Sequence, residues 1–386
     1  MMDDIKMQMV WSKFRSDLEA LWGMVDKLSP VADREDEHEI RILAEKLAYI
    51  LEEDASGTEK YLQDYISQFA GNEIEPCVED YPDLQNDLSI LKDVNFLTDI
   101  KKWGELHPQK FHKFVEVFKA IFAPPAKNGV TFRRSAYISL VTILENLLTS
   151  LLVVGTQAQI GIWGYRKKIQ QLENSGLDLS NYPVETDLIN KINRRRNLFV
   201  HKDGIIDQEF LVHETGMVKY ENRRFQVNTP YLMESIQNVY LFGFLVFELC
   251  WDKWGGSRKI IDQLLVDALY SLLVKEKYDF AIRLAEHEGS RITDLNYFQM
   301  AIINQAIAYR DSGRVSEVQK AISQIKKPAS DHIRLGRLIL QKKYTEAYRL
   351  SIKLKQTQKS EYLPNWDWPL FRPVRSQARW KVLMEE

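Results

Sequence analysis

Cysteine is scarce in this sequence. Only two cysteines occur among the 386 residues, Cys77 and Cys250, and they lie far apart. A disulfide framework and a cysteine-rich zinc site both need more thiols than this, so the sequence excludes both as organising features. Such sparing use of cysteine fits a reducing, cytoplasmic compartment, which is where we expect the protein to act.

The sequence also lacks a secretory signal and a long uninterrupted apolar run. Residues 1–10 contain no basic segment followed by an apolar one. The two most apolar stretches are residues 140–155 and 241–250. The first contains Glu145 and Asn146, and the second is about half as long as a bilayer-spanning helix. We therefore expect both to be core helices, and we expect no membrane partner.

Motifs typical of nucleotide-binding loops and hydrolases are absent as well. There is no Gly-x-x-x-x-Gly-Lys-Ser/Thr phosphate loop and no Gly-x-Ser-x-Gly elbow. The seven histidines are dispersed, at positions 38, 107, 112, 201, 213, 287 and 332. Because metal sites in proteins draw on clustered histidine, cysteine and carboxylate ligands, we expect no metal and no other cofactor.

Charge is spread unevenly along the chain although the formal net charge is only −2. Counted from the sequence, residues 1–130 carry −11 and residues 251–386 carry +8. Solvated helix faces account for much of this. The basic C-terminal part is also compatible with an anionic partner such as RNA, but charge alone does not establish one.

Apolar residues recur at helical spacing through most of the chain, which predicts an all-α fold. The helical segments that this pattern predicts are 10–29, 37–52, 58–70, 132–169, 185–201 and 231–254, with short helices joined by turns in 72–108. Residues 208–228 alternate more and allow a small β-hairpin with Gly216 near its tip. The breaks suggest three regions: an acidic helical region at 1–125, a helical bundle at 130–255 and a repeat-like region at 258–386.

The last third of the chain contains a recurring element. Lys277-Tyr278 and Lys343-Tyr344 each begin a Lys-Tyr-x-x-Ala core, and Gly313 marks an equivalent turn between them. The spacing is near that of tetratricopeptide repeats, which these helical hairpins resemble, although the full signature is absent. We expect the aromatic segment 362–379 to cap the last hairpin by burying its tryptophans; docking of a partner through exposed aromatics is the alternative.

The segment Arg196–His201, which reads RNLFVH, is the most informative in the chain. Asn197 and His201 are four residues apart, so a helix places them on one face, and the long Arg196 side chain can reach the same site. Cleavage of RNA needs groups that move protons and a cation that stabilises the developing charge. Histidine and arginine supply these functions. One histidine cannot act as acid and base at once, so two chains paired about a two-fold axis would complete the site.

This segment resembles the Arg-polar-x-x-x-His motif of the HEPN superfamily, and Asp203-Gly204 follows it as in one subgroup of these domains. The resemblance covers roughly residues 130–255 and implies a helical bundle. It also implies a homodimeric, metal-independent endoribonuclease of the toxin or antiphage-defence kind, with RNA as substrate. By position, Arg196, Asn197 and His201 would be catalytic.

Three other residues receive roles on the same basis. Glu145 would be an accessory to the catalytic trio, or a carboxylate paired with one of the arginines 194–196. Arg194 and Arg195 would bind the RNA backbone, or would simply be solvated. The flanking helical regions would offer surfaces to a regulatory protein partner. The alternative function is a non-catalytic helical scaffold or protein-interaction module, in which His201 is structural.

Overall fold

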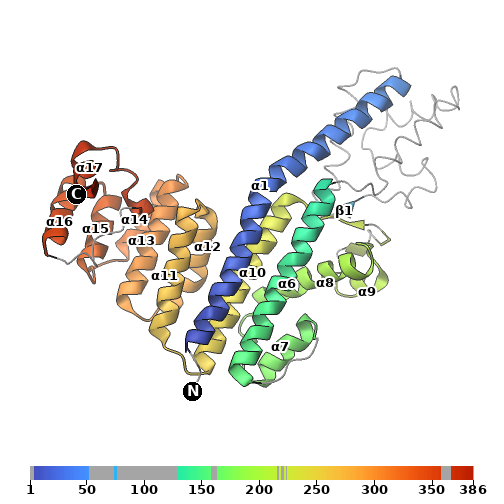
Figure 1. Ribbon diagram of the computed structural model, residues 1–386, viewed down its shortest axis with the longest axis horizontal. Helices are drawn as coiled ribbons and strands as arrows, with labels where there is room; N and C mark the ends of the chain where they lie inside the picture. The colour runs from blue at the N-terminus through green and yellow to red at the C-terminus, as the bar shows by residue number, and fades with distance from the viewer. Residues whose placement is uncertain are drawn as a thin grey trace. The chain divides into compact units, whose positions relative to one another are not determined.

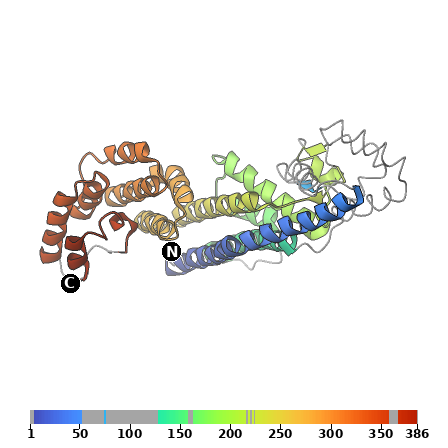
Figure 2. The same ribbon diagram turned by 90° about the horizontal axis from the view of Figure 1, so that it is seen from above.

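The computed structural model confirms the all-α class: nearly all of the regular structure that it describes is helical (Figures 1 and 2). The structure describes residues 4–51, 74–75, 128–157, 163–214, 217–218, 221–222, 224–357 and 367–385. The helix predicted at 58–70 lies outside these ranges, and so does the predicted stretch of short helices and turns at 72–108 except for residues 74–75. Those two residues form a strand, so the prediction was wrong there. The chain divides into two compact units, residues 2–250 and 251–386, so the boundary falls inside one predicted helix, 231–254.

The first unit contains six helices and two short strands among its described residues. They are α1 (Asp4–Leu51), β1 (Ile74–Glu75), α6 (Asn128–Thr156), α7 (Tyr165–Asn174), α8 (Pro183–His201), α9 (Gln208–Leu211), β2 (Arg224–Phe225) and α10 (Thr229–Lys253). Helix α1 runs alongside α6 and α10 (Figure 1). The N-terminal helix therefore belongs to the same unit as the central bundle, whereas the sequence placed it in a separate region.

Aromatic packing joins α1 to α10. Trp11 is fully buried, and its ring lies 5.3 Å from Phe247, 5.0 Å from Phe244 and 5.7 Å from Tyr240, measured between centroids. Buried aromatic side chains remove large apolar areas from water, and such ring pairs add a further contribution. The result is a rigid layer of long helices against which the shorter ones pack.

A polar contact fixes the other end of this layer. The Asp33 carboxylate in α1 accepts hydrogen bonds from Arg133 Nη1 of α6 at 2.8 Å and from Thr229 Oγ1 of α10 at 3.0 Å. Helix α1 continues through Pro30 to reach this point, where the sequence predicted two separate helices, 10–29 and 37–52.

Two further predictions for the first unit were wrong. The pattern over 132–169 predicted one helix, but α6 ends at Thr156 and α7 begins at Tyr165. The small hairpin that the pattern allowed over 208–228 is also not found among the residues described there. Residues 208–211 form α9, and β2 pairs antiparallel with β1, far away in sequence, while Arg224 also bridges Ile205. Alternation over a few residues does not identify the strand partner, which is set here by the tertiary fold.

The second unit is built largely from three helical hairpins. Their helices are α11 (Arg258–Val274) with α12 (Tyr278–Glu288), α13 (Leu295–Asp311) with α14 (Val315–Ser323), and α15 (Asp331–Leu340) with α16 (Tyr344–Thr357). Short 3₁₀ helices, η4 (Gly289–Arg291) and η6 (Pro369–Phe371), and a final helix, α17 (Ala378–Glu385), complete its described elements. Helix α13 lies in the middle and packs against α11, α12, α14 and α15.

The same turn closes each hairpin. Glu276, Gly313 and Lys342 all have positive φ, of 59°, 82° and 61°. In each turn the next residue donates its backbone N–H to the carbonyl five residues earlier, at 2.8–2.9 Å. This hydrogen bond and the left-handed residue together form a Schellman-type helix end. The recurrence matches the predicted hairpins; their assignment to the tetratricopeptide family stays a prediction.

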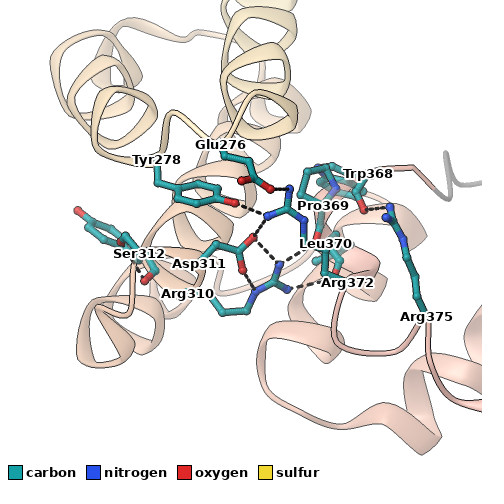
Figure 3. Close-up of polar contacts among 11 residues, drawn as sticks. Glu276, Tyr278, Arg310, Asp311, Ser312, Trp368, Pro369, Leu370, Arg372 and Arg375 are labelled. Atoms are coloured by element: carbon teal, nitrogen blue, oxygen red, sulfur yellow. Dashed lines mark hydrogen bonds and ion pairs between the residues drawn. The ribbon is translucent and has the colours of Figure 1, made fainter. Parts of the chain in front are cut away.

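Part of the aromatic segment, residues 368–375, packs onto these hairpins, as Figure 3 shows. Leu370 and Phe371 are fully buried, and Trp368 Nε1 donates to Asn304 Oδ1 at 3.0 Å. The prediction was that this segment buries its tryptophans, but Trp368 is only half-buried and the fully buried side chains are Leu370 and Phe371. The segment is anchored on α13 and α15 rather than on the last hairpin alone. Trp366 lies outside the described residues.

Arginines hold this segment through backbone and carboxylate contacts. Arg310 of α13 donates to the carbonyl oxygens of Pro369 and Leu370 at 2.7 and 3.0 Å. Arg372 in turn donates to Asp311 at 3.2 Å and to Glu276 at 3.1 Å, and it contacts the Tyr278 hydroxyl (Figure 3). The first two hairpins are thereby joined to the C-terminal segment by a charged network.

Among the described residues, two helices have the length and apolar composition of a membrane span, in the ranges Gly129–Thr156 and Thr229–Lys253. Both contribute to the core of the first unit: Leu144 and Leu148 of α6 and Phe244 and Leu245 of α10 are almost fully buried. Core helices meet the same criteria of length and composition, so the finding alone does not indicate a membrane.

We predict that Gly243→Ala destabilises the first unit. A Cβ at Gly243 in α10 would lie 2.4 Å from the Phe14 ring, which is itself buried in α1. Overpacking of this kind costs about 1–3 kcal/mol in the free energy of unfolding. The matched control is Gly23→Ala in α1, where an added Cβ would have no atom within 4 Å. This substitution should stabilise the helix by about 0.5–1 kcal/mol. Urea denaturation of both variants measures the difference, and equal stability would contradict this packing.

Candidate functional site

The Arg196–His201 segment forms the last two turns of α8. The helix begins at Pro183, with Glu185 in its first turn, where proline and an acidic side chain are both favoured. It ends at His201, as the sequence predicted. The chain reverses at Gly204, whose φ is +86° and whose N–H donates to the Leu198 carbonyl at 2.8 Å. This abrupt end leaves His201 exposed, on the wall of a cleft.

The cleft has a volume of about 530 Å³ and is formed by side chains from α6, α7, α8 and the segment after α8. The three motif residues with a predicted catalytic role, Arg196, Asn197 and His201 of α8, all line the cleft. Glu145 of α6, the predicted accessory residue, lines it too. Arg194 lines it as well. The structure thus brings together five of the six site residues that the sequence predicted.

Arg196 is held by two neighbours. Its Nη1 donates to Asn197 Oδ1 at 3.1 Å, and its Nη2 lies 3.7 Å from Glu145 Oε2. The side chain thereby curves around the helix toward the face that carries Asn197. Glu145 was predicted to be either an accessory to the catalytic trio or the ion-pair partner of one of the arginines 194–196. The structure shows the ion pair, and its partner is Arg196, the arginine of the motif. A guanidinium positioned in this way can bind a phosphate in a fixed orientation.

Lys168 of α7 supports the same corner of the cleft. Its Nζ donates to the backbone carbonyl of Glu145 at 3.2 Å, and its side chain is buried. Burial lowers the pKa of Lys168, the Glu145 carboxylate opposes this effect, and the Arg196 guanidinium adds to it. Lys168 therefore places a second cation close to Arg196, although Lys168 itself is not among the residues that line the cleft.

His201 is exposed. Within the described ranges, its imidazole has no hydrogen-bond or ion-pair partner. A structural histidine at a helix end usually makes such a contact, whereas a group that moves protons must be reachable by substrate. The imidazole is thus presented to solvent in the cleft, beside Asn197.

The two arginines before Arg196 have different environments. Arg194 donates to Glu214 Oε1 from both Nη2 and Nε, at 2.7 and 3.2 Å, so its charge is already paired within the chain. Arg195 is only 3% exposed. Its guanidinium lies 4.7 Å from the Phe225 ring and 4.8 Å from the Tyr231 ring. The expectation that Arg195 binds the RNA backbone is therefore wrong, because the side chain belongs to the core.

Sequence reasoning missed one wall of the cleft. The residues after α8 that line it are Lys202, Asp207, Glu209, Phe210 and His213. The alternating pattern over 208–228 suggested a hairpin there, so these residues were not predicted to line a site. His213 was counted only among the dispersed histidines. Its position after the motif helix, across a glycine turn, was the available signal.

Asp207 organises this wall. It caps α9 by accepting from the Phe210 N–H at 3.0 Å and pairs with Lys202 Nζ at 3.0 Å. Partial burial alone would raise the pKa of Asp207, but the Phe210 N–H and the Lys202 ammonium hold it below its usual value. The carboxylate is therefore ionised at neutral pH and keeps the segment after α8 folded against the helix.

Metal ligands do not gather at this cleft. Among the residues that the structure describes, no group of three or more histidine, cysteine or acidic side chains is placed to hold an ion. The only cysteine in these ranges, Cys250, is buried, and burial raises the pKa of its thiol. The chemistry that the cleft offers is that of its lining side chains, which are guanidinium and ammonium groups, amides, carboxylates and two imidazoles.

We predict that Arg195→Ala destabilises the first unit by about 2 kcal/mol, because a desolvated guanidinium between two aromatic rings is lost. The matched control is Arg166→Ala, since Arg166 is an exposed arginine of α7; a surface change there should stay within about 0.5 kcal/mol. Thermal and urea unfolding measure both. If Arg195→Ala were as stable as the control, the buried position of this side chain would be refuted.

Comparison with known proteins identifies no family for this chain. No family model matches the chain, and no curated protein or solved structure matches it either. The HEPN-like reading of the Arg196–His201 segment stays a prediction from its residues.

Proposed function

We propose that this chain is a metal-independent endoribonuclease of the HEPN type. The observation that carries the proposal is the shared cleft: Arg196 and Asn197 line it next to His201, and the His201 imidazole is exposed there. These are the residue types that RNA cleavage by the 2′-hydroxyl requires, and the cleft volume falls in the range of small-molecule sites, large enough for a nucleotide.

The reaction follows from these groups. The 2′-oxygen of a ribose attacks the adjacent phosphorus while a neutral imidazole accepts the hydroxyl proton. The bond from phosphorus to the 5′-oxygen breaks, and that oxygen takes a proton from an acid. The products are a 2′,3′-cyclic phosphate and a 5′-hydroxyl. Arg196 stabilises the extra negative charge on the phosphorane, and Glu145 positions Arg196 through their ion pair.

A homodimer is part of this proposal, because pairing about a two-fold axis would bring a second imidazole to the phosphate. We place the activity in the cytoplasm, as a toxin or antiphage-defence effector. The three hairpins of the second unit, closed by the same turn, would offer a surface to a regulatory protein.

The second candidate is a non-catalytic scaffold. It is supported by the ion pairs of Arg196 with Glu145 and of Arg194 with Glu214, since both arginines have partners within the chain. The exposed His201 favours the nuclease instead, because a structural role gives no reason for an unpaired imidazole in a cleft.

We expect purified protein to cleave a mixed RNA pool in the presence of EDTA and His201→Ala to lose this activity by about 10²–10⁴-fold. The matched control is Val200→Ala, the neighbouring residue, which is 46% exposed and does not line the cleft; it should cleave at the wild-type rate. Gel analysis of the products, with identification of cyclic phosphate ends, measures the result.

Two outcomes would refute this assignment. One is a folded His201→Ala variant that cleaves as fast as Val200→Ala. The other is wild-type cleavage that disappears on adding EDTA and returns with a divalent metal, because the cleft residues would then not account for the reaction.

A further inference from the structure

A buried ammonium group lies behind the corner of the cleft that contains Glu145. Lys168 of α7 is only 7% exposed, and its one hydrogen bond within the described ranges goes from Nζ to the Glu145 carbonyl oxygen at 3.2 Å. That oxygen also accepts a hydrogen bond from Thr149 Oγ1 at 2.8 Å, so it has a partner without the lysine. Because taking a charge out of water is costly, the packing of α7 against α6 gives no reason for a lysine at this position.

The Lys168 ammonium interacts with both charges of the Arg196–Glu145 pair. Burial lowers the pKa of Lys168, the Glu145 carboxylate raises it, and the Arg196 guanidinium lowers it further. Two cations therefore share one carboxylate at this corner. The carboxylate can neutralise only one of them, so the three side chains together keep a net positive charge.

Arg196 is paired with Glu145 only loosely. The distance from Nη2 to Glu145 Oε2 is 3.7 Å, which is too long for a hydrogen bond, and the buried Nε has no hydrogen-bond partner among the described residues. Arg194 uses the same two nitrogens, Nη2 and Nε, to bind Glu214 at 2.7 and 3.2 Å. These nitrogens form an edge of the guanidinium that binds oxygens of carboxylate or phosphate. That edge is occupied in Arg194, whereas in Arg196 it makes no hydrogen bond.

The position of Lys168 gives a physical reason for the loose pair. An ammonium held 3.2 Å from the Glu145 carbonyl oxygen attracts the carboxylate of the same residue and opposes its close approach to Arg196. The side chains of Arg196 and Glu145 are 19% and 15% exposed, so water and salt screen these charges only in part.

We infer that Lys168 is a positioning residue that shares the Glu145 carboxylate with Arg196 and thereby keeps the Nε–Nη2 edge of Arg196 available to an RNA phosphate. The inference rests on the proposed ribonuclease function for the identity of the anion. When a phosphate binds Arg196, Glu145 keeps Lys168 as its counter-ion, so the carboxylate is not left without one. Each chain of the proposed homodimer would contribute one such corner to the composite site.

The first experiment measures the binding of a non-cleavable 2′-O-methyl RNA oligonucleotide to Lys168→Met, which removes the charge and keeps an unbranched side chain. We expect the Kd to rise about tenfold, because Glu145 then pairs fully with Arg196. We also expect the midpoint of urea unfolding to stay at or above that of wild type, because a buried charge has been removed. Unchanged binding would overturn the inference.

Adding Glu145→Gln to Lys168→Met separates charge sharing from a structural role. The second substitution removes the carboxylate that otherwise occupies Arg196, so the double variant should recover wild-type binding. A merely structural Lys168 would act through the backbone carbonyl of residue 145, which the substitution leaves in place. Binding that stays weak in a folded double variant would therefore overturn the inference.

The matched control is Lys167→Met. Lys167 is the exposed neighbour of Lys168 and lines the cleft, so its substitution removes the same charge without the same contacts. The effects of Lys167→Met and Glu145→Gln on binding should be additive, whereas those of Lys168→Met and Glu145→Gln should not. If both lysine variants were rescued equally, the effect would be one of net charge alone, and the inference would be overturned.

Cleavage assays keep this inference apart from the proposed function. Wild-type protein that shows this order of affinities but cleaves no RNA would refute the ribonuclease and still support the shared carboxylate at an anion site. Wild-type protein that cleaves RNA, with binding unaffected by Lys168→Met, would refute the inference alone.

Discussion

The packing of α1 against α10 and α6 is the constraint on which the described parts of the first unit depend. Trp11 lies among Phe244, Phe247 and Tyr240, and Gly243 allows the Phe14 ring to approach the α10 backbone closely. Once these helices are locked, α6 has a fixed inner face in the core. Its Glu145 then meets the end of α8, where the cleft is formed.

Three consecutive arginines in α8 show how the helix distributes its chemistry. Successive side chains point about 100° apart, so the three reach different surroundings. Arg194 pairs with Glu214, Arg195 lies between two aromatic rings in the core, and Arg196 reaches Glu145 in the cleft. Only the last has both the position and the access that a substrate phosphate requires.

The second unit follows a different principle. Each hairpin turn repeats the same left-handed residue and the same backbone hydrogen bond, so local interactions specify much of its structure. The C-terminal segment adds long-range contacts, since Arg310 and Arg372 connect it to helix ends that are about 60 to 96 residues away in sequence. The position of this segment therefore depends on its contacts with the hairpins.

The sequence by itself determined the helical class, the C-terminal end of α8 and the hairpin turns, and it identified Arg196, Asn197 and His201 as candidates. Helical periodicity and glycine after a helix end act over a few residues, so they can be read locally. The pairing of β2 with β1, the burial of Arg195 and the arrival of His213 in the cleft could not be read in this way. Each depends on contacts between segments far apart in the chain or on the direction in which a neighbouring element packs. The tertiary structure alone decided them, because burial and proximity are properties of the packed helices and not of any one segment.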